Sequence, residues 1–177
     1  MISHGFPPDF SPLRAAIRKT YRYRIHDAPW RPVLHRHLAW RWKSRLDVAA
    51  MQEAAAALVG EHDFTSFETT PSARVSKVRT IYRLEVARHS ADADISDAEV
   101  WLEVAGNGFL YNMVRIIAGS LVMVGCGKRR PQWLRDVLAA RSRPAAGPTA
   151  PPQGLVLLAV ELDPEPAWAL SLPNSEV

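Results

Sequence analysis

The sequence predicts an α+β fold, with one mixed or antiparallel sheet and helices on one face of it. Two kinds of segment indicate this fold: stretches that alternate apolar and polar residues, as strands do, and stretches with apolar residues at three- and four-residue spacing, as helices have. The chain has 177 residues, of which 47% are hydrophobic and only 9 are glycine. Such a composition is sufficient for one sizeable core and is not that of a disordered chain.

A strand and a helix are the first predicted elements. Residues 19–26 (KTYRYRIH) alternate aromatic or aliphatic side chains with polar ones, so one face of this strand should pack and the other should be basic. An alanine-rich stretch follows Asp47, whose side chain is of the type that caps a helix N-terminus. Gly60 is expected to end this helix, because glycine commonly follows the last helical residue.

The remaining elements are a hairpin, two helices and a last strand. Residues 78–88 and 99–105 alternate around the turn sequence DADISDAE, which predicts an antiparallel hairpin. Apolar residues at helical spacing predict a helix over 109–124, and a proline suits the first turn of a second helix over 131–141. Nearly continuous apolar residues at 154–162 predict a final strand near the centre of the sheet.

Several classes of protein are excluded by composition. No segment has the ~18 consecutive apolar residues that a membrane span needs, and the N-terminus lacks the pattern of a secretory signal, so a cytoplasmic protein is expected. The single cysteine, Cys126, excludes an internal disulfide. His35 and His37 could suggest a metal site, but they have no cluster of cysteines or carboxylates near them, so a surface or RNA-facing role is favoured and no metal is expected.

Positive charge is concentrated near the start of the chain. Residues 1–45 contain ten basic and two acidic residues, a net charge of +8, which leaves −4 for the other 132 residues of a chain whose total is +4. Five aromatic residues are interleaved with these charges: Tyr21, Tyr23, Trp30, Trp40 and Trp42. The pattern fits contacts with a nucleic-acid backbone and stacking on its bases, although a solvated basic face has the same composition.

Arg115 is the only charged residue within the apolar segment 109–124. Either its side chain extends to solvent, or it is buried and needs a carboxylate or phosphate partner, since an unpaired buried charge is strongly destabilising. No acidic residue lies one helical turn away on either side. A partner for a buried Arg115 would therefore come from elsewhere in the fold.

Four blocks of sequence, in this order, resemble the signature of the tRNA pseudouridine synthases of the A family. They are KTYRYRI, LVGEHDFTSF, GNGFLYNMVRIIAGSLVMVGCGK and RSRPAAGPTAPPQGLVLLAVEL. The resemblance runs from Pro8 to Leu162 and is to the C-terminal lobe of these enzymes. It implies two α+β lobes whose sheets join around a basic cleft, a homodimer, and conversion of uridine to pseudouridine in the anticodon stem-loop of tRNA without cofactor or metal.

The resemblance also assigns roles to residues and to parts of the chain. Arg115 matches the arginine that pairs with the catalytic aspartate, Tyr21 matches the tyrosine that packs on the flipped base, and Tyr23 is expected in the core. The residues implied as RNA-binding are Arg18, Lys19, Arg22 and Arg24. The residues implied as structural supports beside the site are Thr149, Ala150, Pro151, Gly154 and Leu155. The implied division is a lead-in left from the inter-lobe segment at 1–18, the C-terminal α+β domain at 19–163, and a tail at 164–177.

The catalytic aspartate of the family has no counterpart in these 177 residues. The family carries it in a Gly-Arg-Thr-Asp-Ala-Gly-Val-His segment, which does not occur here, and residues 10–16 (FSPLRAA) depart from the family's Phe-His-Ala-Arg-Phe-Ser-Ala. The aspartates present are expected in turns, caps or surface helix positions: Asp9, Asp27, Asp47, Asp63, Asp92, Asp94, Asp97, Asp136 and Asp163.

Two functional hypotheses follow for a chain without that segment. In the first, the chain lacks the N-terminal lobe with the nucleophile and is inactive alone, and a complementing N-terminal lobe restores pseudouridine formation. In the second, it is a non-catalytic tRNA- or RNA-binding remnant or partner subunit. Such a remnant would bind tRNA with a strong dependence on salt and would form no pseudouridine.

Overall fold

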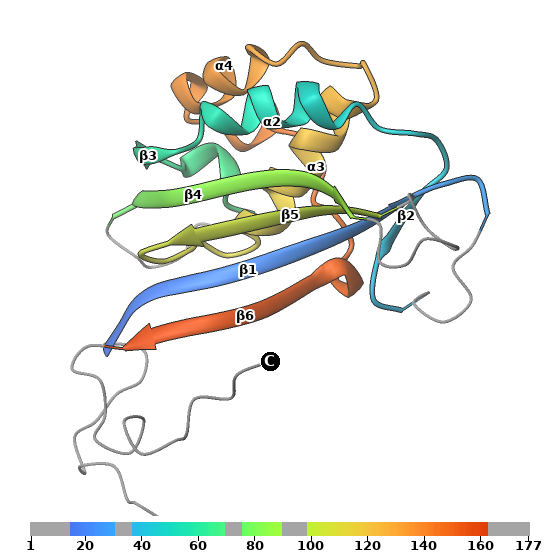
Figure 1. Cartoon of the computed structure of the whole chain (residues 1–177). Coiled ribbons are helices and arrows are strands. Elements are labelled where there is room, and N and C mark those ends of the chain that lie inside the picture. Colours follow the sequence, from blue (N-terminus) through green and yellow to red (C-terminus); the bar gives the residue numbers. More distant parts are fainter. Residues whose placement is uncertain (1–14, 31–36, 70–75, 90–98, 163–177) are drawn as a thin grey trace, which may run out of the picture.

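Six strands form one mixed sheet and three helices cover one of its faces, within the residues that the computed structural model describes, which are 15–30, 37–69, 76–89 and 99–162 (Figure 1). The strands are β1 (Ala16–Asp27), β2 (Trp40–Trp42), β3 (Gly60–Asp63), β4 (Val78–His89), β5 (Glu99–Gly106) and β6 (Leu155–Leu162). The helices are α2 (Val48–Ala56), α3 (Met113–Gly125) and α4 (Trp133–Ala140). The predicted α+β class, with its mixed sheet and its helices on one face, is confirmed.

β1 joins the sheet together, because it has partners along both of its edges. The sheet order is β2-β1-β5-β4-β3, and β6 also pairs with β1. β5 runs antiparallel along residues 19–26 of β1. On the other edge, β6 pairs antiparallel with residues 16–23 and β2 pairs parallel with residues 25–27. The strand predicted at 19–26 is confirmed and is longer at both ends.

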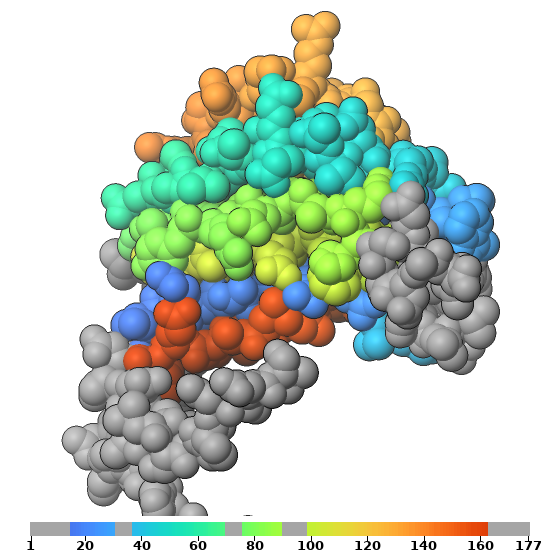
Figure 2. All heavy atoms as spheres, viewed as in Figure 1, coloured from blue at the N-terminus to red at the C-terminus, as the bar shows by residue number. Residues whose placement is uncertain are grey.

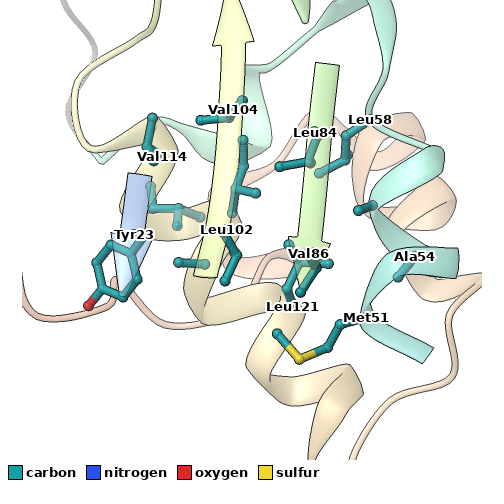
Figure 3. Packing of buried hydrophobic residues seen from close by; sticks show 14 of the residues in the cluster. Tyr23, Met51, Ala54, Leu58, Leu84, Val86, Leu102, Val104, Val114 and Leu121 are labelled. Atoms are coloured by element: carbon teal, nitrogen blue, oxygen red, sulfur yellow. The ribbon is translucent and has the colours of Figure 1, made fainter. Parts of the chain in front are cut away.

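The hydrophobic core lies between the sheet and the helices. Alternate residues of a strand point to one face of the sheet, which is why Tyr23 and Ile25 of β1 are both completely buried. Side chains of β4 and β5 point from the same face toward the helices (Figure 3), and these are Leu84, Val86, Leu102 and Val104. Burial of each large apolar side chain stabilises the fold by about 1.5–3 kcal/mol.

α2 begins where the sequence predicts and ends earlier. The Asp47 side chain accepts a hydrogen bond from the backbone amide of Ala50 at 2.9 Å, so the predicted N-cap is confirmed. The helix ends at Ala56, and the prediction that Gly60 stops it is wrong. Gly60 instead opens β3 with a φ of +107°, a left-handed conformation that glycine adopts without steric cost.

α3 begins four residues later than its apolar pattern predicts. Phe109 and Leu110 belong to the connection that follows β5, and they pack on the core from this loop. Their apolar side chains continue the three- and four-residue spacing of α3 although they are not helical. Asn112 precedes the helix with a φ of +61°, and asparagine is one of the few non-glycine residues that tolerate this conformation. α4 likewise starts at Trp133, two residues beyond the predicted first-turn proline.

β6 lies at an edge of the sheet, which corrects the prediction that it lies near the centre. Among the described residues it pairs with β1 alone, and the apolar side chains between its two end residues are exposed. Figure 2 shows atoms of β6 as a strip at the surface beside β1. An apolar edge strand offers unpaired backbone groups and apolar side chains to another chain segment. A continuous apolar pattern such as that of residues 154–162 therefore has two explanations. It fits a strand at the centre of a sheet, and it equally fits an edge strand whose apolar side chains another chain segment can cover.

Some predictions fall on residues outside the described part of the chain. These are the hairpin turn, residues 10–14, His35 and the tail at 164–177. β1 already begins at Ala16, within the predicted lead-in. No helix in the described part is long and apolar enough to span a membrane.

Candidate functional site

A pocket of about 720 Å³ lies beside the N-terminal turn of α3. β1 contributes Lys19 and Tyr21, β6 contributes Leu155, and the rest of the lining comes from the continuous segment 109–115. Lys19, Tyr21 and Tyr23 are at every second position of β1, so their side chains share the face of the strand that the helices cover. Four residues with sequence-predicted roles thus line one pocket, and they are Lys19, Tyr21, Arg115 and Leu155.

The Tyr21 ring is half-buried and rests against Phe109. The two ring centroids are 5.3 Å apart and the planes are nearly perpendicular, at 89°. This edge-to-face arrangement is a favourable one for aromatic pairs and limits the movement of both rings. Tyr111, another lining residue, is 64% exposed. The pocket therefore presents aromatic surface of the kind on which a flat ring can lie.

Arg115 lies in the first turn of α3 and is half-buried, so neither extreme considered for it applies. Its Nε donates a hydrogen bond to the carbonyl oxygen of Ala150 at 2.6 Å, and its Nη1 donates to Oδ1 of Asn112 at 2.9 Å. Among the described residues, no carboxylate forms an ion pair with it. A guanidinium has five N–H donors, so donors remain for a ligand.

The pocket is cationic. Among the described residues, Lys19 and Arg115 are the charged lining residues, and no aspartate or glutamate is among them. A carboxylate or phosphate that entered would be attracted by both cations and would accept charge-assisted hydrogen bonds from the arginine. The arrangement can thus hold an anion beside an aromatic surface.

The four residues predicted to bind RNA do not all lie at this pocket. Lys19 lines it. Arg18 forms an exposed ion pair with Glu161 of β6 at 3.3 Å, and its guanidinium lies 5.1 Å from the centre of the Tyr82 ring. Such an exposed pair is worth less than about 1 kcal/mol and opens readily for another anion.

Arg22 and Arg24 lie on the face of β1 that points away from the pocket. Arg22 donates to Glu103 at 2.8 Å and lies 3.9 Å from the centre of the Trp101 ring. Arg24 donates to both carboxylate oxygens of Glu99, each at 2.9 Å from its Nη2. Both guanidinium groups are thus engaged within the sheet, and their contact with RNA stays a prediction.

Among the described aspartates, Asp27 is buried at the end of a strand, which corrects its predicted place in a turn, a cap or a surface helix position. It is 1% exposed at the end of β1, and it accepts hydrogen bonds from Arg88 at 2.8 and 2.9 Å. A buried carboxylate paired with arginine is the chemistry that the pocket lacks. Asp27 is nevertheless six residues along β1 from Tyr21, or about 20 Å at roughly 3.3 Å per residue, so it does not serve the pocket.

Tyr23 is completely buried, in keeping with its predicted place in the core. Its hydroxyl points away from the apolar cluster (Figure 3) and donates a hydrogen bond of 2.6 Å to the carbonyl oxygen of Pro151. Burial raises the pKa of Tyr23 above its usual value, while the charge of Arg115 opposes this shift. Tyr23 therefore links the core to the loop that contacts Arg115.

Tyr23→Phe should lower the free energy of unfolding by about 1–3 kcal/mol near pH 7, because the Pro151 carbonyl loses its donor. Tyr23 stays protonated in the fold while an unfolded tyrosine ionises above about pH 10, so its stabilising contribution is complete below that pH and falls by about 1.4 kcal/mol per pH unit above it. Urea unfolding of both proteins at pH 7, 10 and 11 measures this. A stability gap that stays constant up to pH 11 would contradict the assignment.

Three residues at or near the site were not found by sequence reasoning. Phe109 was placed inside a helix, and it instead holds Tyr21 from a loop. Asn112 was given no role, and its left-handed conformation places its side chain on Arg115. Arg143 lies in a proline- and alanine-rich stretch that contained no chemical signal, and its contacts with neighbouring loop residues depend on the folded backbone.

Comparison with known proteins gives one consistent result. A family model described as tRNA pseudouridine synthase matches residues 54–163. The protein "tRNA pseudouridine synthase A" of Brevibacillus brevis is 52% identical over 139 residues, which are 78% of this chain and 54% of that protein. The proteins of the same name from Acidiphilium cryptum and Bacillus subtilis are 45% and 43% identical, over 89% and 90% of this chain and 60% of each relative. The chain thus spans little more than half the length of these relatives.

Proposed function

The chain belongs to the tRNA pseudouridine synthase family, and from that premise we propose that it supplies the arginine-bearing half of a site that converts uridine to pseudouridine in tRNA. The other half, with the nucleophilic aspartate, comes in this proposal from a segment of the Gly-Arg-Thr-Asp-Ala-Gly-Val-His type. The observation that carries the proposal is a cationic pocket in which Arg115 has N–H donors left for a ligand and in which none of the described lining residues is acidic.

The reaction explains why such a pocket is useful. Pseudouridine formation breaks the bond between N1 of the base and C1′ of the ribose and makes a bond from C1′ to C5 of the same base. A carboxylate that acts as nucleophile or base must remain ionised in a site closed to water, and a neighbouring guanidinium lowers its pKa and orients it. Two hydrogen bonds hold the Arg115 guanidinium at the pocket, which supports this role for it.

The aromatic wall of the pocket gives the base a place to lie. An enzyme that acts on a base within folded RNA must first take that base out of its stack. The uracil ring can then pack on Tyr21, whose ring is supported from the side by Phe109. Lys19, at the same pocket, is suited to a neighbouring phosphate.

We propose further that the complementing lobe covers the edge of β6 along which no other described strand pairs. Apolar side chains along this strand are exposed, and they are Val156, Leu157, Leu158 and Val160. Leu155, the first residue of the strand, lines the pocket, so a segment that covers this edge passes beside Arg115 and Tyr21. An assembly of two lobes, or of two copies of a complete enzyme, would remove this apolar surface from water.

A chimera tests the proposal directly. The portion of the Brevibacillus brevis relative that this chain does not match is joined to this chain, and tritium release from tRNA labelled at C5 of uridine is measured. We expect turnover by the chimera and none above background by the chain alone. The matched control is the chimera with the relative's nucleophilic aspartate changed to alanine.

The possible results separate the two functional hypotheses. Turnover by the pure chain would refute the need for a second carboxylate-bearing segment. A folded chimera that binds tRNA in a salt-dependent manner and forms no pseudouridine would refute the catalytic proposal and favour the RNA-binding remnant.

A further inference from the structure

We propose that Arg143 is a positioning residue for Arg115 and acts through the bracing loop, by which we mean residues 146–151. Arg143 does not line the pocket, so it has no direct contact with a bound base or carboxylate. Its effect is on where the Arg115 guanidinium is held. The catalytic part of this inference rests on the proposed function, whereas the structural part concerns this chain alone.

Arg143 holds the bracing loop at two points. Its Nη1 donates a hydrogen bond to the carbonyl oxygen of Gly147 at 2.9 Å, and its Nη2 donates to Oγ1 of Thr149 at 3.2 Å. The guanidinium is planar and its donors have a fixed spacing, so two such bonds set the separation of the two acceptors. Lysine, with a single ammonium group, cannot reproduce that geometry.

The loop also packs directly on the backbone of α3. The amide of Gly147 donates to the hydroxyl of Ser120 at 3.0 Å, and this hydroxyl donates to the carbonyl oxygen of Ile116 at 2.8 Å. A Cβ atom at Gly119 would overlap the carbonyl oxygen of Pro148. The helix and the loop are therefore in close backbone contact, and Arg143 adds two hydrogen bonds to the same loop.

Ala150 transmits the position of the loop to Arg115. Its carbonyl oxygen accepts the bond from Nε of Arg115 at 2.6 Å, and its amide donates to the Arg115 carbonyl oxygen at 3.1 Å. Backbone and side chain of Arg115 are thus tied to one loop residue, which directly follows Thr149. A shift of the loop after loss of Arg143 would move the guanidinium together with Ala150.

The first experiment uses the chain by itself and needs no activity. In Arg143→Met, which keeps most of the length of the side chain and removes its donors, we expect the Nε–H of Arg115 to exchange with solvent about tenfold faster in an NMR measurement. Arg143→Lys should give a smaller increase. Arg135→Met, a control on the exposed face of α4, should leave the exchange rate unchanged.

The second experiment uses the chimera. Arg143→Met should lower kcat by about tenfold to a hundredfold and leave KM for tRNA within about twofold, because a misplaced catalytic partner slows the reaction without weakening the binding of tRNA. The acid limb of the pH dependence of kcat should move to higher pH, since a displaced Arg115 lowers the pKa of the catalytic carboxylate less. A residue that only stabilises the fold would not move this limb.

Each experiment tests a different part of the inference, so one part can be refuted without the other. An unchanged exchange rate of the Arg115 Nε–H in folded Arg143→Met would overturn the inference, even if the chimera is inactive and the proposed function falls. Faster exchange with an unmoved acid limb and an unchanged kcat would overturn the catalytic part. If Arg143→Met does not fold, Thr149→Val, which removes one of the two acceptors, decides by the same readouts.

Discussion

Replacing Arg115 by methionine in the chimera is expected to lower kcat for pseudouridine formation by about 10²- to 10³-fold. The guanidinium is the cation in the pocket that the structure holds in a defined orientation, through Ala150 and Asn112. Removal of one preorganised hydrogen-bond donor from an active site commonly has an effect of this size. Lysine keeps the charge and cannot keep both hydrogen bonds, so Arg115→Lys should retain only part of the activity.

The alternative role for Arg115 is contact with an RNA phosphate, and the two roles give different results. A phosphate contact would make the substitution raise KM for tRNA and reduce the salt slope of tRNA binding by about one, with kcat little changed. Pairing with the catalytic carboxylate affects kcat and leaves the salt slope as it was. Arg129→Met, at the surface beside Trp133 and outside the pocket lining, serves as the control. An unchanged kcat in Arg115→Met would rule out the proposed pairing.

The parts of the fold that the sequence predicts well are those decided by local periodicity. Tyr21 and Tyr23 are two residues apart in a strand, so they share a face, and one of them lies in the core while the other lines the pocket. The N-cap at Asp47 is equally local, because its acceptor and the amide that it binds are three residues apart. Such features need no knowledge of distant segments.

The features that were missed depend on how distant segments meet. Arg22 lies directly opposite Glu103 because of the register between β1 and β5, and that register cannot be read from either strand alone. The resemblance assigns Arg22 and Arg24 to RNA binding together with Lys19, whereas strand alternation puts these two arginines on the other face of the sheet, and their contact with RNA stays a prediction. The contact between Arg115 and Ala150 joins residues 35 positions apart and has no local signal.

Asp27 gives the second large prediction, which concerns stability. Its carboxylate accepts bonds from Nη1 and Nη2 of Arg88 and from the amide of Leu46 at 2.9 Å, and Arg88 also donates to the Leu46 carbonyl oxygen at 3.0 Å. These contacts join the ends of β1 and β4 to the segment that enters α2. Asp27→Ala would remove the carboxylate to which both the partly buried Arg88 guanidinium and the buried Leu46 amide donate, and would leave the guanidinium charge without this counter-charge. We expect the free energy of unfolding to fall by about 3–5 kcal/mol.

A double-mutant cycle distinguishes the lost ion pair from lost packing. If the cost of Asp27→Ala is mainly the unpaired charge, then Arg88→Met added to it should recover stability, because removal of both members of a buried pair is far less destabilising than removal of one. Arg83→Met, which breaks the ion pairs of the exposed Arg83 side chain with Glu85 and Glu103, should cost about 1 kcal/mol or less in the same urea titrations. A double variant as unstable as the sum of its two single variants would show that Asp27 acts through its bond to Leu46 instead, as the residue that fixes the entry of the chain into α2.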